Sequence, residues 1–284
     1  MIGAARALAR ALAVIAVVTT PAVAQSWRTL DVSRQLHDSG EHSVRVRYPV
    51  GRLSMRATSD PVLYSMQLRY DEDRMRPIHR FDAESRRLTL GFEGDNDRWR
   101  NYHGEFDQSE LTLAFSQAVL LDLDLELGAA EARIDVGGLS VSRMRIETGA
   151  ADARLDFSAP NKARMRRLDI QLGAASFVVR NLGNANVGDI SVEGGVGSID
   201  LDFGGAIEQD VTVNANVAIG KLALRLPQTV GIRVEIQKVL ASFEHPGLTK
   251  RGDAYYSDNW DDAKVRMRVR AQTVFGAVEI DRSR

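Results

Sequence analysis

Cysteine is absent from the sequence, and its absence excludes two features of many exported proteins. Without cysteine the chain cannot form a disulfide framework, and it offers no thiol for the attachment of a lipid. Because covalent cross-links are excluded, the stability of the folded chain must come from packing alone.

The sequence also lacks the short motifs of common enzyme classes. It contains no HExxH zinc motif, no GxSxG nucleophile turn and no glycine-rich phosphate loop, and its 5 histidines are scattered. The 37 basic residues nearly balance the 38 acidic residues, so the net charge is −1. A near-neutral chain lacks the strongly basic face of a nucleic-acid-binding protein. These absences predict a protein that is not an enzyme, uses no cofactor or metal, and binds no nucleic acid.

The hydrophobic run at the N-terminus is too short to cross a membrane. Arg6 and Arg10 precede the apolar segment Ala11–Val18, whereas a membrane-spanning helix needs about 20 apolar residues. The sequence AVA at residues 22–24 then matches the A-x-A cleavage site of a secretory signal peptide. The sequence therefore predicts a cleaved signal peptide at residues 1–24, no membrane span after cleavage, and an extracytoplasmic location in the periplasm or outside the cell.

A phrase recurs along the chain with a period of about 20 residues. The segment LELGAAEARIDV, from Leu125 to Val136, is followed by IETGAADARLDF, from Ile146 to Phe157. Related units follow one another to the C-terminus, and they begin at Leu123, Met144, Leu168, Ile190, Val211, Ile232 and Met267. Such a period is typical of solenoids, in which each unit buries its apolar face against its neighbours. The repeat predicts about seven regular coils stacked in chain order.

Each unit consists of two short runs in which apolar and polar residues alternate. In the first unit the apolar sets are Leu123, Leu125 and Leu127, then Ala132, Ile134 and Val136. Alternation with a period of two predicts β-strands with one buried and one exposed face. Parallel stacking of these strands about 4.8 Å apart gives an all-β parallel solenoid, in which Ile134 and Leu155 lie side by side.

A glycine separates the two runs in the first four units, at Gly128, Gly149, Gly173 and Gly195. The chain must turn a tight corner at this point, and glycine adopts positive φ at little cost. Two alanines follow each of the first three glycines, because the inside of a corner has little room. The sequence therefore predicts that these four glycines have positive φ.

The N-terminal part of the mature chain is less regular. The segment SVRVRYPVGRLSMRA, from Ser43, has the two-run layout with Pro49 and Gly51 at its corner. Further alternating segments follow, and the polar stretch from 95 to 108 is typical of a loop. We therefore predict an irregular N-terminal β segment at residues 25–108 and a regular solenoid at residues 109–284. The insertion HPGLTKRGDAYYSDNWDDAK, before the last unit, is expected to project as a loop.

Two segments carry a resemblance to a known family: LDLDLELGAAEARIDVGGLSVSRMRIETGAADARLDFSAP, at residues 121–160, and less specifically SVRVRYPVGRLSMRA. From about Val44 to its end, the chain resembles the toast-rack domain proteins. These are related to the C-terminal domain of LiaF-type cell-wall-active antibiotic response proteins and to adhesin-like bacterial solenoids. The resemblance implies a right-handed β-solenoid on the outer side of a bacterial cytoplasmic membrane, with no established catalytic site. Unlike LiaF-type proteins the chain lacks transmembrane helices, so a part in a membrane signalling complex is not implied.

The repeat also predicts a row of acidic and amide side chains on the outer surface. Stacking in chain order aligns Glu126, Glu147, Gln171, Glu193, Asn214 and Glu235. A row of oxygen ligands could hold Ca²⁺, which takes about six to eight of them. The alternative is a solvated face, on which neighbouring charges of both signs, at Asp124, Arg145 and Asp169, relieve the repulsion. The second interpretation is favoured, because one row without backbone ligands rarely completes the coordination of calcium.

The carboxylates best placed for glycosidic chemistry are Asp200 and Asp202, with Asp135 and Asp156 nearby in the stack. Cleavage of a glycosidic bond needs two carboxyl groups about 5–10 Å apart in a cleft. The alternative is the ordinary polar face of a strand, and outward alternation alone provides no environment that shifts a carboxyl pKa. We therefore assign no catalytic residue.

Two aromatic clusters and a basic turn complete the candidate sites. The insertion contains Tyr255, Tyr256 and Trp260, and the polar stretch contains Trp99, Tyr102 and Phe106. These side chains either cover an end of the core, as the terminal coils of a solenoid require, or bind a protein or sugar. The basic turn contains Lys162, Arg164, Arg166 and Arg167. It is either simply solvated or attracts an anionic envelope polymer.

Together these patterns favour an exported bacterial β-solenoid that acts as a non-enzymatic interaction, adhesion or envelope-stress module. Its partner would be a protein or a glycan of the cell envelope. The alternative is a carbohydrate-binding or carbohydrate-active solenoid, which would show a concave acidic cleft with a carboxyl of raised pKa. A homo-oligomer is a third interpretation, because open terminal strands are templates for pairing unless they are covered.

Overall fold

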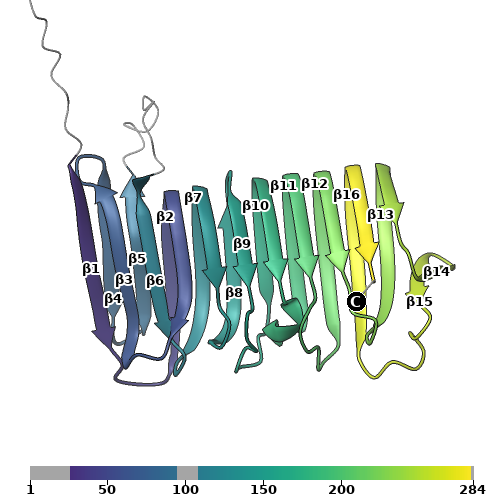
Figure 1. Cartoon of the computed structure of the whole chain (residues 1–284), viewed down its shortest axis with the longest axis horizontal. Helices are drawn as coiled ribbons and strands as arrows, with labels where there is room; N and C mark the ends of the chain where they lie inside the picture. The colour runs from purple at the N-terminus through teal and green to yellow at the C-terminus, as the bar shows by residue number, and fades with distance from the viewer. Residues whose placement is uncertain (1–25, 95–107, 283–284) are drawn as a thin grey trace, which may run out of the picture.

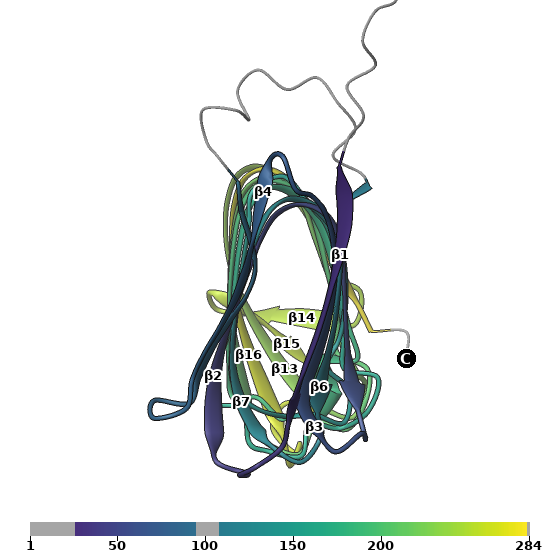
Figure 2. The ribbon, with the colours of Figure 1, turned by 90° about the vertical axis from the view of Figure 1, so that its left-hand side faces the viewer.

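The computed structural model describes residues 26–94 and 108–282, and these residues form one long mixed sheet. Apart from a 3₁₀ turn, η2 (Leu182–Ala185), the regular secondary structure of these residues consists of strands. Figure 1 shows the strands side by side along the long axis of the molecule, and Figure 2 shows two walls joined by a bend. The predicted all-β class is confirmed, and the stacked strands fit a solenoid.

The strands of the N-terminal part are β1 (Trp27–Gln35), β2 (Glu41–Thr58), β3 (Val62–Asp71), β4 (Met75–Asp82), β5 (Arg87–Gly94) and β6 (Glu110–Ser116). The following strands are β7 (Leu120–Asp135), β8 (Ser140–Thr148), β9 (Asp152–Asp156), β10 (Leu168–Arg180) and β11 (Asp189–Asp202). The last are β12 (Val211–Arg225), β13 (Gly231–Glu244), β14 (Leu248–Arg251), β15 (Ala254–Ser257) and β16 (Arg266–Asp281).

The long strands cross the bend and contribute to both walls. The first half of β7 pairs with β8 and its second half pairs with β9, and β10 pairs with the same two strands on their other side. These pairings are parallel, as are those that connect β10, β11, β12, β16 and β13. Ile134 lies opposite Leu155 on the adjacent strand, so the predicted pairing of equivalent residues in neighbouring units is confirmed.

The core lies between the two walls and consists of the inward residues of each alternation. Leu125 is opposite Ile146, and Ile170 and Val192 continue the same column on the next two strands. All four are fully buried. Burial of a side chain of this size stabilises the fold by about 1.5–3 kcal/mol. Because the described residues contain no disulfide, such columns of apolar contacts hold the walls together.

The predicted stacking of the units in chain order is wrong at the C-terminal end. The last strand of the chain, β16, lies between β12 and β13, and β13 is the outermost strand of the parallel stack. The insertion before β16 makes this order accessible, because it allows the chain to leave β13, form the β14–β15 hairpin and return. Alternation identifies each strand and its buried face, but it does not identify the neighbours of that strand.

The predicted positive φ at Gly128, Gly149, Gly173 and Gly195 is also wrong, because none of these four is among the positive-φ glycines of the chain. Their role is close packing of one backbone on the next. A Cβ atom on Gly173 would lie 2.6 Å from the carbonyl oxygen of Gly149, and one on Gly195 would lie 2.6 Å from that of Gly173. The bend therefore needs residues without a side chain, although their backbone conformation is ordinary.

The glycines that do need positive φ form a second column two residues further along the chain. Gly197, Gly220 and Gly276 have φ values of 141°, 140° and 127°. They are aligned on β11, β12 and β16. A Cβ on any of them would lie within 1.9 Å of a carbonyl oxygen on the preceding strand of the stack. This column keeps three successive strands bent in the same way.

The N-terminal strands extend the two walls with a different topology. β2 pairs with β7 across the bend in both walls, so it is stacked like the later units. On its other side, β5 pairs with its first half and β6 with its second half, both in parallel. The outer strands pair in antiparallel orientation: β4 pairs with β5, β3 pairs with β6, and β1 pairs with β3. The predicted signal peptide and most of the polar stretch lie outside the described residues.

Candidate functional site

The outer surface beside the bend carries a groove that runs across β8, β10, β11, β12, β16 and β13, with a volume of about 790 Å³. We call it the glycine groove, because Gly173 and Gly195 line it and leave no side chain to fill it. A polar row borders it, consisting of Glu147, Gln171, Glu193, Asn216, Gln272 and Gln237 in strand order. Each member lies opposite the next, so amide and carboxylate groups recur at the spacing of the strands.

This row differs from the one that the sequence predicts. Glu193 is opposite Asn216, whereas Asn214 is opposite Ser191 and Arg270, and Glu235 is opposite Arg270. Asn214 and Glu235 therefore belong to the adjoining row. The last three units are displaced by two residues relative to the first four. A displacement of two residues preserves the inward and outward faces, so alternation does not reveal it.

A second hollow continues the glycine groove toward the N-terminal strands, and the two share Glu147 and Thr148. Tyr48 and Gly128 line this continuation. The Tyr48 hydroxyl lies 3.3 Å from the Ser109 hydroxyl, and burial raises the pKa of Tyr48 well above its usual value. Tyr48 is fully buried, so its ring forms part of the floor of the hollow and its hydroxyl is held inside the core by Ser109.

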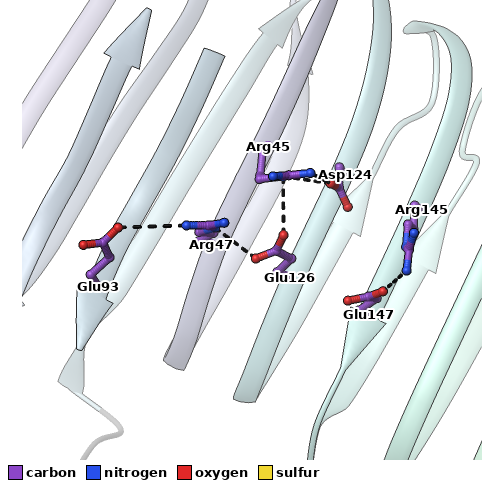
Figure 3. Close-up of polar contacts among 7 residues, drawn as sticks. All are labelled: Arg45, Arg47, Glu93, Asp124, Glu126, Arg145 and Glu147. Carbon is purple, nitrogen blue, oxygen red and sulfur yellow. Dashed lines mark hydrogen bonds and ion pairs between the residues drawn. The ribbon is translucent and has the colours of Figure 1, made fainter. Parts of the chain in front are cut away.

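Arginines accompany the acidic residues of this continuation (Figure 3). Arg47 donates to Glu126 over 3.0 Å, Arg45 donates to Asp124 over 2.9 Å, and Arg145 pairs with Glu147. The hydrogen bond with Asp124 raises the pKa of Arg45. Such exposed ion pairs each contribute only about 0–1 kcal/mol to stability. Their effect here is to cancel charge along the groove.

The acidic row therefore does not present a set of cation ligands. Gln171 separates Glu147 from Glu193, and Glu235 forms ion pairs with Arg233 and Arg270. Within residues 26–94 and 108–282, no three His, Asp or Glu side chains are placed to hold a metal ion together. Four amides, the paired Glu147, Glu193 and Lys238 line the groove, so most of its polar groups are neutral hydrogen-bonding groups.

An apolar stripe follows the glycine groove on its other side. It consists of Val196, Ile219, Phe275 and Leu240, which are 53%, 48%, 46% and 67% exposed and lie opposite one another on β11, β12, β16 and β13. Val274 and Val239, in the groove beside it, are also exposed, at 43% and 72%. Contiguous exposed apolar surface of this kind marks interaction sites. Sequence reasoning missed the stripe.

The backbone at the bend explains why the alternation did not reveal the apolar stripe. The strand pairing skips one residue per strand there, at Gly195 on β11 and Ala218 on β12. This irregularity shifts the alternation, so Val196 points outward although Ile199, three positions later, points inward. In the sequence, such an outward residue can be recognised as an apolar residue directly after the corner glycine, at an odd number of positions from the buried residues of the second run.

The candidate catalytic carboxylates take part in structural contacts. Asp200 accepts from Arg225 over 2.6 Å, and the same guanidinium lies 3.9 Å from Asp202. Asp135 accepts from the Ser158 hydroxyl, and Asp156 accepts from the side-chain amide of Asn181 over 2.7 Å. Asp135 and Asp156 are opposite each other on adjacent strands, at the ends of β7 and β9. These contacts orient turns and balance charge, and they bring no carboxyl pair to the glycine groove.

The aromatic insertion folds against the end of the stack. It does not project as a free loop, because β14 and β15 form a hairpin and β15 pairs with β13 at Arg233 and Val234. Figure 2 shows this hairpin across the far end of the walls. The Tyr255 ring lies 5.0 Å from that of Phe243, and Tyr256 lies 5.6 Å from Trp260. The contacts of Tyr255 with the core support the capping interpretation. Trp99, Tyr102 and Phe106 lie outside the described residues.

The basic turn is divided among separate partners. Arg166 pairs with Glu41, Arg167 donates to Asp169 over 2.6 Å, and Lys162 donates to Gln117 over 3.3 Å. The hydrogen bond with Asp169 raises the pKa of Arg167. Only Arg164 of the four has no contact of this kind among the described residues. Three of the four basic side chains of this turn therefore contact separate groups, two of which are carboxylates.

Comparisons with known proteins agree with this architecture. A family model described as the N-terminal domain of toast_rack, DUF2154, matches residues 24–180. The chain is similar to a proposed cell adhesion protein from Clostridium sporogenes, with 13% identity over 91% of this chain and 100% of that chain and a TM-score of 0.51. It is also similar to a proposed adhesin from Bacteroides fragilis, with 8% identity over 90% and 98% of the two chains and a TM-score of 0.31.

At such low identity the likeness to the Clostridium sporogenes structure supports the fold alone. No curated protein sequence gives a significant match. The described residues also contain no helix that is both long and apolar enough to cross a membrane.

Proposed function

Because the chain belongs to the toast-rack family, we propose that it is an exported, non-enzymatic interaction module of the bacterial cell envelope, which binds an extended segment of another envelope protein along the glycine groove. The match to the family model begins at residue 24, where the predicted signal peptide ends. Cleavage after residue 24, a right-handed winding of the strands and a place in the periplasm or on the outer surface belong to this proposal. The similarity to a proposed cell adhesion protein agrees with it.

The observation that carries the proposal is the pairing of the polar row with the apolar stripe. The polar row offers four amides and two carboxylates as hydrogen-bonding groups at intervals of one strand, and the parallel stripe offers apolar contact along the same direction. An extended peptide has the same two properties, because its backbone presents hydrogen-bonding groups and its side chains alternate. The stripe is aliphatic except for Phe275, which favours a protein over a glycan as the partner.

Binding to isolated envelope fragments tests this proposal. The variant with Val196→Ser, Ile219→Ser and Phe275→Ser is expected to bind at least tenfold more weakly than the unchanged protein, because these side chains supply most of the apolar contact. Arg154→Ser is the control, since Arg154 is exposed on a strand but lies outside the groove and stripe. Bound and free protein after sedimentation of the fragments give the affinity.

Treatment of the fragments distinguishes the partners. Protease digestion is expected to abolish binding, whereas digestion of the glycan strands is expected to leave it unchanged. Loss of binding only after glycan digestion would favour the carbohydrate-binding alternative. Equal binding of the triple variant and the unchanged protein would exclude the glycine groove and the apolar stripe as the interaction surface.

A further inference from the structure

Among the described residues, the two walls end in three strands that have an open edge. At the N-terminal end, β1 pairs there only with β3, and β4 pairs only with β5. At the other end, β15 covers β13 only at Arg233 and Val234, and the rest of β13 pairs with β16 alone. An open edge presents unpaired N–H and C=O groups and is a template for further strands. Charged residues that point inward are one way in which natural proteins protect such edges.

On β13 the inward charge is Lys238. It lies opposite Thr273 on β16, and Val217 continues the same column on β12. Thr273 and Val217 are 4% and 3% exposed, so this column points into the core. Lys238 is the last member of the column and is exposed, and its amine donates to the Ala241 carbonyl oxygen over 2.9 Å. A lysine therefore stands where a further strand would require a buried side chain.

On β1 the inward charge is Arg34. It lies opposite Tyr64 on β3, and Phe115 follows in the same column on β6. Both of these rings are fully buried. The Cζ atom of Arg34 lies 3.9 Å from the centre of the Phe81 ring on β4, which belongs to the opposite wall (Figure 2). The guanidinium group therefore lies between the two walls at the N-terminal end of the core.

On β4 the polar residue at an inward position is His79. It lies opposite Leu90 on β5, and Val46 continues the column on β2. Leu90 and Val46 are fully buried, whereas His79 is exposed at the end of the column. Its imidazole forms a hydrogen bond with the Tyr64 hydroxyl of the facing wall. Each of the three open strands therefore has a lysine, arginine or histidine in line with buried residues of its neighbours.

The open edge of β13 also carries exposed apolar side chains, since Val239 and Leu240 are 72% and 67% exposed. Such an edge attracts a further strand unless a charge opposes it. We infer that Arg34 and Lys238, together with His79, prevent strand addition at both ends and keep the chain a single stack of fixed length. A strand added beside β1 or β13 would enclose a guanidinium or ammonium group between the walls, where an unpaired charge is strongly unfavourable. This protection does not depend on a ligand in the glycine groove.

Removal of the inward charges tests this inference at each end separately. Sedimentation velocity of the exported chain from about 1 to 100 µM is expected to show a single copy. Lys238→Val and Arg34→Val are each expected to self-associate in this range, because valine continues the apolar column of the edge. Lys238→Arg and Arg34→Lys keep the charge and are expected to remain single copies. Lys162→Val is the control, because it makes the same exchange at an exposed turn in the middle of the stack.

A relocated lysine shows whether the association uses the edge. Ile236 also points inward on β13, because it lies opposite the buried Ala271. Addition of Ile236→Lys to Lys238→Val returns a charge to the same face of the strand and is expected to restore the single copy, with urea unfolding as the check that each variant is folded. Equal association of the unchanged chain and both valine variants, at any level, would overturn the inference. So would association of Lys238→Val that the added lysine does not reverse, because it would use another surface.

Discussion

Replacement of Gly220 by alanine is expected to destabilise the fold by roughly 3–5 kcal/mol. Gly220 has a φ of 140°, where residues other than glycine are strained, and an added Cβ would lie 1.8 Å from the carbonyl oxygen of Gly197. The collision cannot be relieved by a side-chain movement, because the opposing atom belongs to the backbone. A shift of β12 would break its ladder with β11 or with β16, which hold it on both sides.

Urea unfolding of the variant measures this effect, and Gly188→Ala is the matched control. Gly188 has ordinary φ, and the nearest atom to an added Cβ, the Asp210 carbonyl oxygen, is 4.0 Å away. Its replacement is expected to change the free energy of unfolding by no more than about 0.5 kcal/mol. Equal unfolding midpoints for the two variants would mean that the backbones do not approach each other at the bend as closely as described.

The glycines illustrate how far a sequence can be interpreted without coordinates. The recurrence of Gly128, Gly149 and Gly173 locates the bend correctly, because the repeat aligns equivalent positions. It does not reveal whether a glycine is there for its φ or for the absence of a side chain. That distinction depends on the distance to the next backbone, which a single sequence does not encode. Gly197 and Gly220 were not identified as corner residues for the same reason.

The order of the last strands was unpredictable for a different reason. The inward residues of β13 and β16, such as Val234 and Val269, are interchangeable as core residues, so either strand can pack beside β12. The insertion between them pairs with β13 and places Tyr255 against Phe243, so it lies at the outer end next to the outermost strand. Alternation within the two strands contains no information about this contact.

The candidate site was predictable only in part. Glu147, Gln171 and Glu193 were correctly placed in one outward row, because the first four units share one register. The apolar stripe was not predictable, because it depends on the extra residue at the bend that moves Val196 outward. The polar row could therefore be predicted from the sequence, whereas the apolar stripe beside the same groove could not.

A second large effect is expected at Asn161, on the opposite side of the walls from the bend. Its side-chain amide donates to the carbonyl oxygens of Val141, over 2.9 Å, and Ala185, over 3.1 Å, and its side-chain oxygen accepts from the Val141 N–H over 2.8 Å. Asn161 is only 5% exposed, so water cannot replace these bonds. One side chain thus joins turns from three levels of the stack.

Asn161→Ala is expected to lower the free energy of unfolding by about 2–4 kcal/mol, because buried backbone groups lose their partners. Asn216→Ala is the matched control, since Asn216 is exposed on β12 and forms no side-chain hydrogen bond among those of the described residues. The control is expected to change stability by less than about 0.5 kcal/mol. Chemical unfolding of both variants at pH 7 provides the comparison.

Asn161→Asp separates the loss of hydrogen bonds from the loss of volume. The new carboxyl would face two carbonyl oxygens in a buried position, and both burial and these acceptors favour its protonated form, so its pKa in the folded state is raised. A raised pKa means that the favourable contribution is present at low pH and is lost as the pH rises through the folded-state value. Relative to Asn161→Ala at the same pH, this variant should be more stable near pH 4 than near pH 7. If the difference between the two variants does not change with pH, the turn must open to water, and the three bonds of Asn161 cannot be what joins the levels of the stack.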